Sequence, residues 1–285
     1  IIAGCLLLCA PMFESANFMP DERIHLPENK TTYLATLYGK ALDARNPAPI
    51  LGDTYADAAV RRIDFDFESL KLPDGGDITL PVRAKHLDGW TRDFIAAHPT
   101  CTVLHLGCGL DSRVFRIDPP ATVAWYDVDF PDVIDLRRQL YPARDRYTML
   151  GTAIDNLAWV DAIPTGAPVL VIGEGFFMYL AEPEVLALFR RTIGSFPGGE
   201  FIFDAYSAPM VWLVSRLSTV RGAAVTLKWG VGDPHKLEQQ VDGLKLLEEQ
   251  PFFCLPDLVR LGARSRIMCG TPGLRNLVKH VRYRF

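Results

Sequence analysis

The sequence predicts an α/β fold with a mostly parallel sheet, and three stretches of the chain indicate it. Residues 102–106, TVLHL, predict a short buried strand that continues into Gly107-Cys108-Gly109 before polar residues open a helix. Residues 121–126 predict a second strand, which ends in Asp127-Val128-Asp129. Residues 168–173, PVLVIG, are a near-continuous apolar run of the kind that parallel sheets bury on both faces.

The glycine turn predicts a ligand site at the end of the first strand. Gly107 and Gly109 lack Cβ, so the backbone can turn sharply there and approach a ligand closely. The turn is not the dinucleotide fingerprint, because G-x-G-x-x-G would place a third glycine where the chain has Ser112. Asp111 is unfavourable for the phosphates of a dinucleotide but acceptable for a cofactor with an amino group and a sulfonium.

An acidic residue after the second strand is expected to bind a ribose. In sheets of this kind it lies about twenty residues beyond the glycines. Gly107 to Asp127 and Gly109 to Asp129 both have this spacing, so the spacing leaves two candidates.

Three motifs resemble the leucine carboxyl methyltransferase family, most closely its bacterial branch of tetracenomycin-type polyketide O-methyltransferases. They are LGCGLDSR, WYDVDFPDVIDLRR and GEGFFMYL, in that order, and the likeness extends over residues 23–285. The resemblance implies S-adenosyl-L-methionine as the cofactor. It also implies a class I methyltransferase Rossmann-like sheet, mostly parallel, of seven strands with an antiparallel last strand, with N-terminal helices and a helical lid insertion.

The resemblance also suggests how the chain is divided. Residues 19–285 are expected to form one methyltransferase domain, and residues 1–18 an extension that precedes it, with Met19 as a reasonable start. Within the domain we expect an N-terminal helical cap (19–98), a cofactor-binding core (99–206), a lid (207–243) and C-terminal strands and helices (244–285).

Composition restricts the function classes. A chain of 285 residues with 49% hydrophobic content can bury the core of one domain. The net charge of −4 argues against a nucleic-acid partner, because counterion release needs a basic face. The arginine pairs at 61–62, 137–138 and 190–191 lie in predicted helices and are expected on solvated faces.

The cysteines and the first residues indicate a reducing, cytoplasmic location without a membrane partner. Six cysteines, at positions 5, 9, 101, 108, 254 and 269, show no C-x-x-C and no Cys/His pairing, so no metal site is predicted. The apolar run at residues 1–10 is too short to span a bilayer, and no Lys or Arg precedes it as a signal peptide would require.

The segment before the first strand is predicted to be helical, over residues 28–45, 55–63 and 78–97, with an irregular connection at 65–72. The resemblance implies that Lys30 and Tyr33 face the cofactor carboxylate and the mouth of the active site. It also implies that Arg83, in R-x-x-x-x-D with Asp88, binds the methionine carboxylate, which its planar fork suits. The alternatives are an amphipathic packing helix and a surface arginine.

The rest of the chain alternates helices and strands. We expect helices at 131–140, with proline in the first turn, and at 183–193. Further strands are expected at 147–152, 200–203, 244–253 and 280–285, and the last two should form the antiparallel pair that distinguishes methyltransferases from dehydrogenases.

Further site residues follow the third and fourth strands. The resemblance implies an adenine contact at residues 153–156, with Ala153 or Ile154 at the family's acidic position and Asp155 or Asn156 as the polar contact. Glu174 follows the fourth strand, where α/β sheets bind ligands, and is expected to bind the cofactor's ammonium group. The predicted cofactor-binding set is Lys30, Arg83, Gly107, Cys108, Gly109, Asp111, Asp129, Ile154, Asp155 and Glu174.

The predicted function is S-adenosylmethionine-dependent O-methylation of a carboxylate or phenolic hydroxyl on a small aromatic or polyketide-like acceptor. Methyl transfer is a direct displacement, so no covalent nucleophile is needed, and only a phenol needs deprotonation. No catalytic residue is assigned; the candidates are Tyr33, Tyr179 and Tyr206. A protein carboxyl terminus is a less favoured acceptor. The alternatives are a non-catalytic S-adenosylmethionine-binding protein and a nicotinamide-dependent oxidoreductase.

Within the predicted lid, residues 207–230 are expected to cover the acceptor. Its apolar face would be formed by Met210, Val211, Trp212, Val214 and Leu217. Aromatic residues that suggest a flat acceptor are Phe176, Phe177, Tyr206, Trp212 and Trp229, although such residues are also ordinary core.

Overall fold

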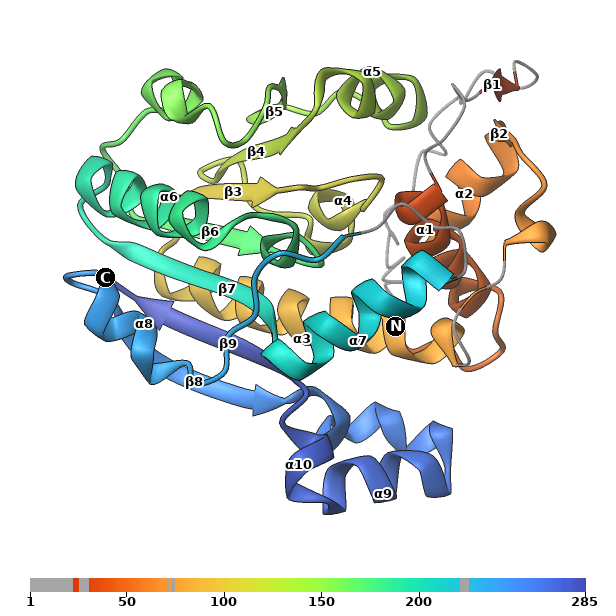
Figure 1. The fold of residues 1–285 in the computed structure, drawn as a ribbon. Helices are drawn as coiled ribbons and strands as arrows, with labels where there is room; N and C mark the ends of the chain where they lie inside the picture. The colour runs from red at the N-terminus through yellow and green to blue at the C-terminus, as the bar shows by residue number, and fades with distance from the viewer. Residues whose placement is uncertain (1–22, 26–30, 71, 73–74, 221–225) are drawn as a thin grey trace, which may run out of the picture.

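The structure is a computed structural model that describes residues 23–25, 31–70, 72, 75–220 and 226–285. At its centre is a seven-stranded sheet in the order β5-β4-β3-β6-β7-β9-β8 (Figure 1). The strands are β3 (Thr102–Leu106), β4 (Ala124–Asp129), β5 (Tyr147–Gly151), β6 (Val169–Gly173), β7 (Gly199–Tyr206), β8 (Lys245–Pro251) and β9 (Val278–Arg284). Only β9 runs antiparallel to its neighbours, which confirms the predicted α/β class and its antiparallel last strand.

Helices cover both faces of this sheet, and every residue of the central strands β3 and β6 is therefore buried. On one face α6 (Glu182–Ser195) packs Leu188 and Phe189 in the cluster that contains Phe201 and Phe203 of β7. On the other face α3 (Gly76–Ala97) and α4 (Arg113–Ile117) pack on the sheet. The residues of this second cluster include Leu87, Trp90 and Phe94 of α3 with Val103, Leu170 and Ile172 of the strands.

Two N-terminal helices lie beyond the carboxyl ends of β3 and β6 (Figure 1). They are α1 (Thr31–Ala44) and α2 (Thr54–Arg62). The helix α2 begins where the Asp53 carboxylate accepts a hydrogen bond from the Ala56 N–H (3.0 Å), a standard N-terminal cap. Leu34 and Leu37 of α1 pack in one cluster with Leu110, so α1 is held against the glycine turn.

The remaining elements are mostly short. The helices are α5 (Pro131–Leu140), α7 (Ala208–Val220), α8 (His235–Gln240), α9 (Ala263–Gly270) and α10 (Pro272–Arg275). The 3-10 helices are η1 (Phe67–Ser69), η2 (Leu157–Ala162), η3 (Phe177–Tyr179), η4 (Phe252–Cys254) and η5 (Pro256–Leu261), and β1 (Ile24–His25) pairs in parallel with β2 (Ile63–Asp64). In the described part of the chain no helix is both long and apolar enough to cross a bilayer.

Two strands differ most from their predicted boundaries. The second strand begins at Ala124, because residues 121–122 form a turn closed by the Val123 N–H and the Pro120 carbonyl oxygen (2.9 Å). It ends at Asp129 and therefore includes both Asp127 and Asp129. The strand predicted at 200–203 extends to Tyr206, because β9 pairs with it up to Tyr206 and Val278.

A reducing location would leave the cysteines as thiols, but two of them form a disulfide in the structure. Cys254 in η4 and Cys269 in α9 form a disulfide, with their Cα atoms 5.0 Å apart. Sequence spacing could not reveal it, because the chain folds back on itself between the two residues. Cys101 and Cys108 are free and buried.

The predicted covering segment is a helix, α7, but its packing differs from the expectation. Trp212 is 62% exposed, and Leu213 beside it is also exposed. The Arg216 guanidinium lies 5.5 Å from the centre of the Trp212 ring. Trp212 is therefore on the solvent side of α7 and does not belong to a packed apolar face.

Candidate active site

A cavity of about 800 Å³ opens at the carboxyl ends of β3, β4, β6 and β7, against α1. It brings together almost all predicted site residues. Those that line it are Tyr33, Arg83, Gly107, Cys108, Gly109, Asp111, Asp129, Ile154, Asp155, Glu174, Tyr179 and Tyr206. Lys30 lies outside the described residues.

The glycine turn needs its glycines for two different reasons. Gly107 and Gly109 have φ of +58° and +48°, a region that side-chain-bearing residues rarely adopt. A Cβ on Gly107 would lie 2.3 Å from the Phe176 ring, so this glycine permits close packing. A Cβ on Gly109 would lie 3.3 Å from the Cβ of Tyr33 in α1, at the cavity wall.

Asp129 is the acid of β4 that faces the cavity. Its carboxylate accepts hydrogen bonds from the backbone N–H groups of Gly109 (2.7 Å) and Phe130 (2.7 Å). Burial raises the pKa of Asp129, and these two hydrogen bonds oppose that rise. Asp129 thus joins the end of β4 to the glycine turn and leaves lone pairs toward the cavity.

Asp127, the other candidate, is completely buried and bound within the protein. It accepts hydrogen bonds from Trp125 Nε1 (2.9 Å) and the Tyr147 hydroxyl (2.6 Å), and pairs with His105 Nδ1 (3.1 Å) and the Arg137 guanidinium. It does not line the cavity. Of the two spacing candidates, only Asp129 is available to a ligand.

Arg137 corrects the expectation that the 137–138 pair lies on a solvated face. Its side chain is fully buried, because the inner face of α5 turns toward Asp127 and the glycine turn. Besides Asp127 it donates to the carbonyl oxygens of Gly109 (2.9 Å) and Asp111 (2.8 Å). Arg137 therefore fixes the shape of the turn.

Glu174 follows β6 and lies among three cations. Lys40 Nζ and Arg83 Nε are each 3.2 Å from its Oε1, and the Arg113 guanidinium donates to its Oε2. Burial alone would raise the pKa of Glu174, but Lys40, Arg113 and Arg83 lower it well below its usual range. Glu174 is thus a buried, ionised carboxylate at the cavity wall.

Asp111 is the second buried carboxylate of the cavity. It pairs with Arg116 Nη1 (2.6 Å) and with Lys40 Nζ (3.1 Å), so Lys40 bridges Asp111 and Glu174. Burial would raise the pKa of Asp111, but Arg116, Lys40 and Arg113 outweigh this effect and hold the pKa well below its usual range. Its buried Oδ2 accepts no hydrogen bond from the described residues and lies 3.1 Å from Lys40 Nζ, and it can accept a hydrogen bond from a ligand.

The tyrosines that line the cavity hold their protons at neutral pH. Burial raises the pKa of Tyr33 to about 12, with a further rise from Asp129, and it also raises the pKa of Tyr179 and of Tyr206. These hydroxyls can donate hydrogen bonds, but they are poor general bases.

The segment after β5 gives one side of the cavity. Ala153, Ile154 and Asp155 line it, whereas the Asn156 side chain accepts from the Ala158 N–H and begins η2. Phe130, which also lines the cavity, is 57% exposed. The polar residue of this segment that faces the cavity is therefore Asp155.

The aromatic residues expected around an acceptor are only partly there. Phe176 and Tyr206 line the cavity. Phe177 and Trp229 are buried in the core cluster behind it, and Trp212 is exposed on α7.

Several residues of the cavity were missed from the sequence. Lys40 lies three positions after Leu37, on the apolar face of α1, and a charge on such a face was a usable signal. His105 interrupts an apolar strand, and that interruption was a second usable signal. For Lys228 there was no such signal in the sequence. Its segment reaches the cavity through the hydrogen bond from the Lys228 N–H to the Met178 carbonyl oxygen (2.7 Å).

Comparisons with known proteins identify relatives over nearly the whole chain. A family model described as leucine carboxyl methyltransferase matches residues 34–147. The chain is 40% identical to the tetracenomycin polyketide synthesis O-methyltransferase TcmP of Streptomyces glaucescens, over 93% of this chain and 99% of that protein. It is 34% identical to the S-adenosyl-L-methionine-dependent methyltransferase dpfgK of Gibberella zeae, over 87% of this chain and 90% of that protein. A solved structure of a DUF574 family protein from Streptomyces avermitilis has a TM-score of 0.57 and 15% identity, over 88% of this chain and 96% of that chain.

Proposed function

We propose that this chain, which belongs to the leucine carboxyl methyltransferase family and is an S-adenosylmethionine-dependent O-methyltransferase, methylates a carboxylate on a small aromatic acceptor. The relative named for tetracenomycin polyketide synthesis supports a polyketide as the acceptor class. The cavity volume of about 800 Å³ is sufficient for a cofactor and an acceptor together.

The charges of the cavity fit the amino-acid end of S-adenosylmethionine. Arg83 and Glu174 are an ion pair at the wall, and a zwitterion can pair its carboxylate with Arg83 and its ammonium with Glu174. Asp111 Oδ2 accepts no hydrogen bond from the described residues, although Lys40 Nζ lies 3.1 Å away, and this supports Asp111 as a second acceptor for that ammonium group.

The nucleoside end fits the residues around the glycine turn. Asp129 is proposed to bind the ribose diol, because its carboxylate is fixed by two backbone donors and is open to the cavity. Ile154 and Phe130 would contact the two faces of the adenine, and Asp155 its edge. Cys108 and the flanking glycines would allow the backbone to lie close to the cofactor.

The observation that carries the choice of a carboxylate is a set of hydrogen-bond donors in the part of the cavity that follows β6 and β7. They are the protonated hydroxyls of Tyr179 and Tyr206 and the ammonium of Lys228, which makes no ion pair among the described residues. Such donors orient a carboxylate, which is ionised at neutral pH and needs no general base. When bound, S-adenosylmethionine supplies the methyl group on its sulfonium.

The test compares matched aromatic acids and phenols as acceptors, with the product identified by mass spectrometry. We expect a methyl ester and a rate that is constant between about pH 6 and pH 9, because a carboxyl with a pKa of about 4 is ionised throughout. Formation of a phenyl ether instead, with a rate that rises with pH, would assign the enzyme to phenols. The Asp129→Ala variant is the control for cofactor dependence.

A further inference from the structure

Arg113 is a fully buried cation that contacts the carboxylates of the active site without lining the cavity. It is the first residue of α4, and its side chain has no exposed surface. The cavity is lined by its neighbours Asp111 and Glu174, but not by Arg113 itself. Its effect on a ligand must therefore pass through these neighbours.

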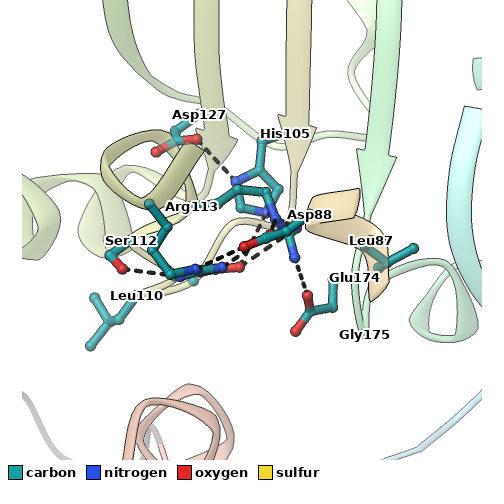
Figure 2. A network of polar contacts seen from close by, with 12 residues as sticks. Leu87, Asp88, His105, Leu110, Ser112, Arg113, Asp127, Glu174 and Gly175 are labelled. Carbon is teal, nitrogen blue, oxygen red and sulfur yellow. Dashed lines mark hydrogen bonds and ion pairs between the residues drawn. The ribbon is translucent and has the colours of Figure 1, made fainter. Parts of the chain in front are cut away.

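The guanidinium contacts Asp88, His105 and Glu174, as Figure 2 shows. Arg113 Nε donates to Asp88 Oδ1 of α3 (2.6 Å), and Nη2 donates to Glu174 Oε2 after β6. Its Nη1 lies 3.4 Å from His105 Nε2 of β3 and 3.6 Å from Asp111 Oδ2. Because the guanidinium is planar and rigid, anchoring Nε on Asp88 sets the direction in which Nη2 meets Glu174.

The other two cations at Glu174 differ from Arg113 in one respect. Lys40 and Arg83 line the cavity, and both can be drawn to the carboxylate of a ligand. Arg113 is screened from the cavity, so its hydrogen bond to Glu174 can persist with a ligand present.

We infer that Arg113 is a positioning residue that holds the Glu174 carboxylate in the orientation that receives the cofactor's ammonium group. The inference rests on the proposed role of Glu174. Without Arg113, Glu174 loses the one cation that does not face the ligand, and it remains buried. A buried carboxylate that loses a charged partner turns toward its remaining partners and binds a proton more readily.

The test measures the affinity of S-adenosylhomocysteine and of its deaminated analogue, in which hydrogen replaces the ammonium group, by titration calorimetry. The wild-type protein should prefer the ammonium-bearing ligand. In Arg113→Gln this preference should fall on the order of 10-fold to 100-fold, the factor for one charged hydrogen bond. A purely structural defect would weaken both ligands alike and would leave this preference unchanged.

The matched control is Arg137→Gln, which removes an equally buried arginine that fixes the glycine turn but does not contact Glu174. It should weaken both ligands by similar factors and leave the preference unchanged. If Arg113→Gln does not fold, Arg113→Lys replaces it: one ammonium cannot reach Asp88 and Glu174 in the same way, so an intermediate preference is expected.

The double variant with Glu174→Gln completes the test. If Arg113 acts through Glu174, Arg113→Gln should not lower the preference further in that background. A full additional loss there, or an unchanged preference in the single variant, would overturn the inference. A wild-type protein without any preference for the ammonium group would instead reject the proposed role of Glu174, and the inference with it.

Discussion

At the scale of single residues, position along a strand decides whether a carboxylate faces the cavity or is bound within the protein. Asp127 and Asp129 are two residues apart in β4, so their side chains leave the strand on the same side. Asp127 lies where β4 pairs with β3, and Arg137 of α5 covers it, whereas Asp129 is the last residue, lies beyond the pairing with β3 and opens to the cavity.

Substituting these acids should separate binding from stability. Asp129→Ala should weaken S-adenosylhomocysteine binding by about 1–3 kcal/mol, the range for losing a charged acceptor, with little change in stability. Asp127→Ala should lower the free energy of unfolding by about 3–5 kcal/mol, because Arg137 is left buried and unpaired. Calorimetric titration and urea denaturation of both variants measure the two quantities, and a folded, stable Asp127→Ala that fails to bind would reverse the assignment.

At the scale of elements, the contact between α1 and α3 holds the helix that brings Lys40 and Tyr33 to the cavity. A Cβ on Gly39 of α1 would lie 2.7 Å from Leu80 Cδ1 and 3.1 Å from the Gly76 carbonyl oxygen of α3. The two helices can approach this closely only because position 39 has no side chain.

Gly39→Val should push α1 away from α3, lower the melting temperature and weaken S-adenosylhomocysteine binding. The matched control is Gly89→Ala, where a Cβ meets no atom within 4 Å. Because alanine favours the helix, that variant should gain about 0.5–1 kcal/mol without a change in affinity. Thermal unfolding and calorimetric titration give both readouts, and equal behaviour of the two variants would contradict a close α1–α3 contact.

The disulfide of the C-terminal helical segment is expected to contribute to the stability of the protein but not to ligand binding at the cavity. Cys254 and Cys269 are separated by 15 residues and neither lines the cavity. Replacing both with serine should cost about 3 kcal/mol of stability, as expected for closing a loop of this length. The affinity for S-adenosylhomocysteine should stay within twofold. Thermal unfolding with and without a reductant measures the effect, and a wild-type protein insensitive to the reductant would show that the bond contributes nothing.

At the scale of the whole molecule, buried titratable groups predict acid sensitivity. Burial would raise the pKa of Asp127, but Arg137 and His105 lower it to about 2 from 3.8, and the pKa values of Asp111 and Glu174 are also lowered. Their stabilisation is complete above the unfolded pKa and is lost as the pH falls through the folded pKa. Burial lowers the pKa of His86 from 6.5 to about 4, so the unfolded chain binds that proton first as the pH drops.

The melting temperature should therefore begin to fall near pH 6.5 and fall most steeply below about pH 4. Thermal unfolding between pH 8 and pH 2 tests this profile. In His86→Gln the decline between pH 6.5 and pH 4 should be shallower, with the steeper acid limb unchanged. A melting temperature that rises on acidification would show that these groups do not control the stability.

The sequence by itself determined the central strands, the glycine turn, the family and most of the predicted residues that line the cavity. Strands β3 and β6 could be predicted because both of their faces are buried, which leaves a mostly apolar run in each. The turn could be predicted because Gly107 has a positive φ and no room for a Cβ, so the position requires glycine. Such features depend on local geometry and burial, which residue type and spacing report directly.

Only the tertiary structure decided which long-range partners meet. It placed Asp129 rather than Asp127 at the cavity and buried Arg137. It also joined Cys254 to Cys269 and brought Lys40 and Arg113 to Glu174. Lys40 and Glu174 are 134 positions apart, and no periodicity connects residues at that separation. Periodicity reports that a side chain is buried, but a charge pairs with whatever the packing of helices and strands brings within reach of it.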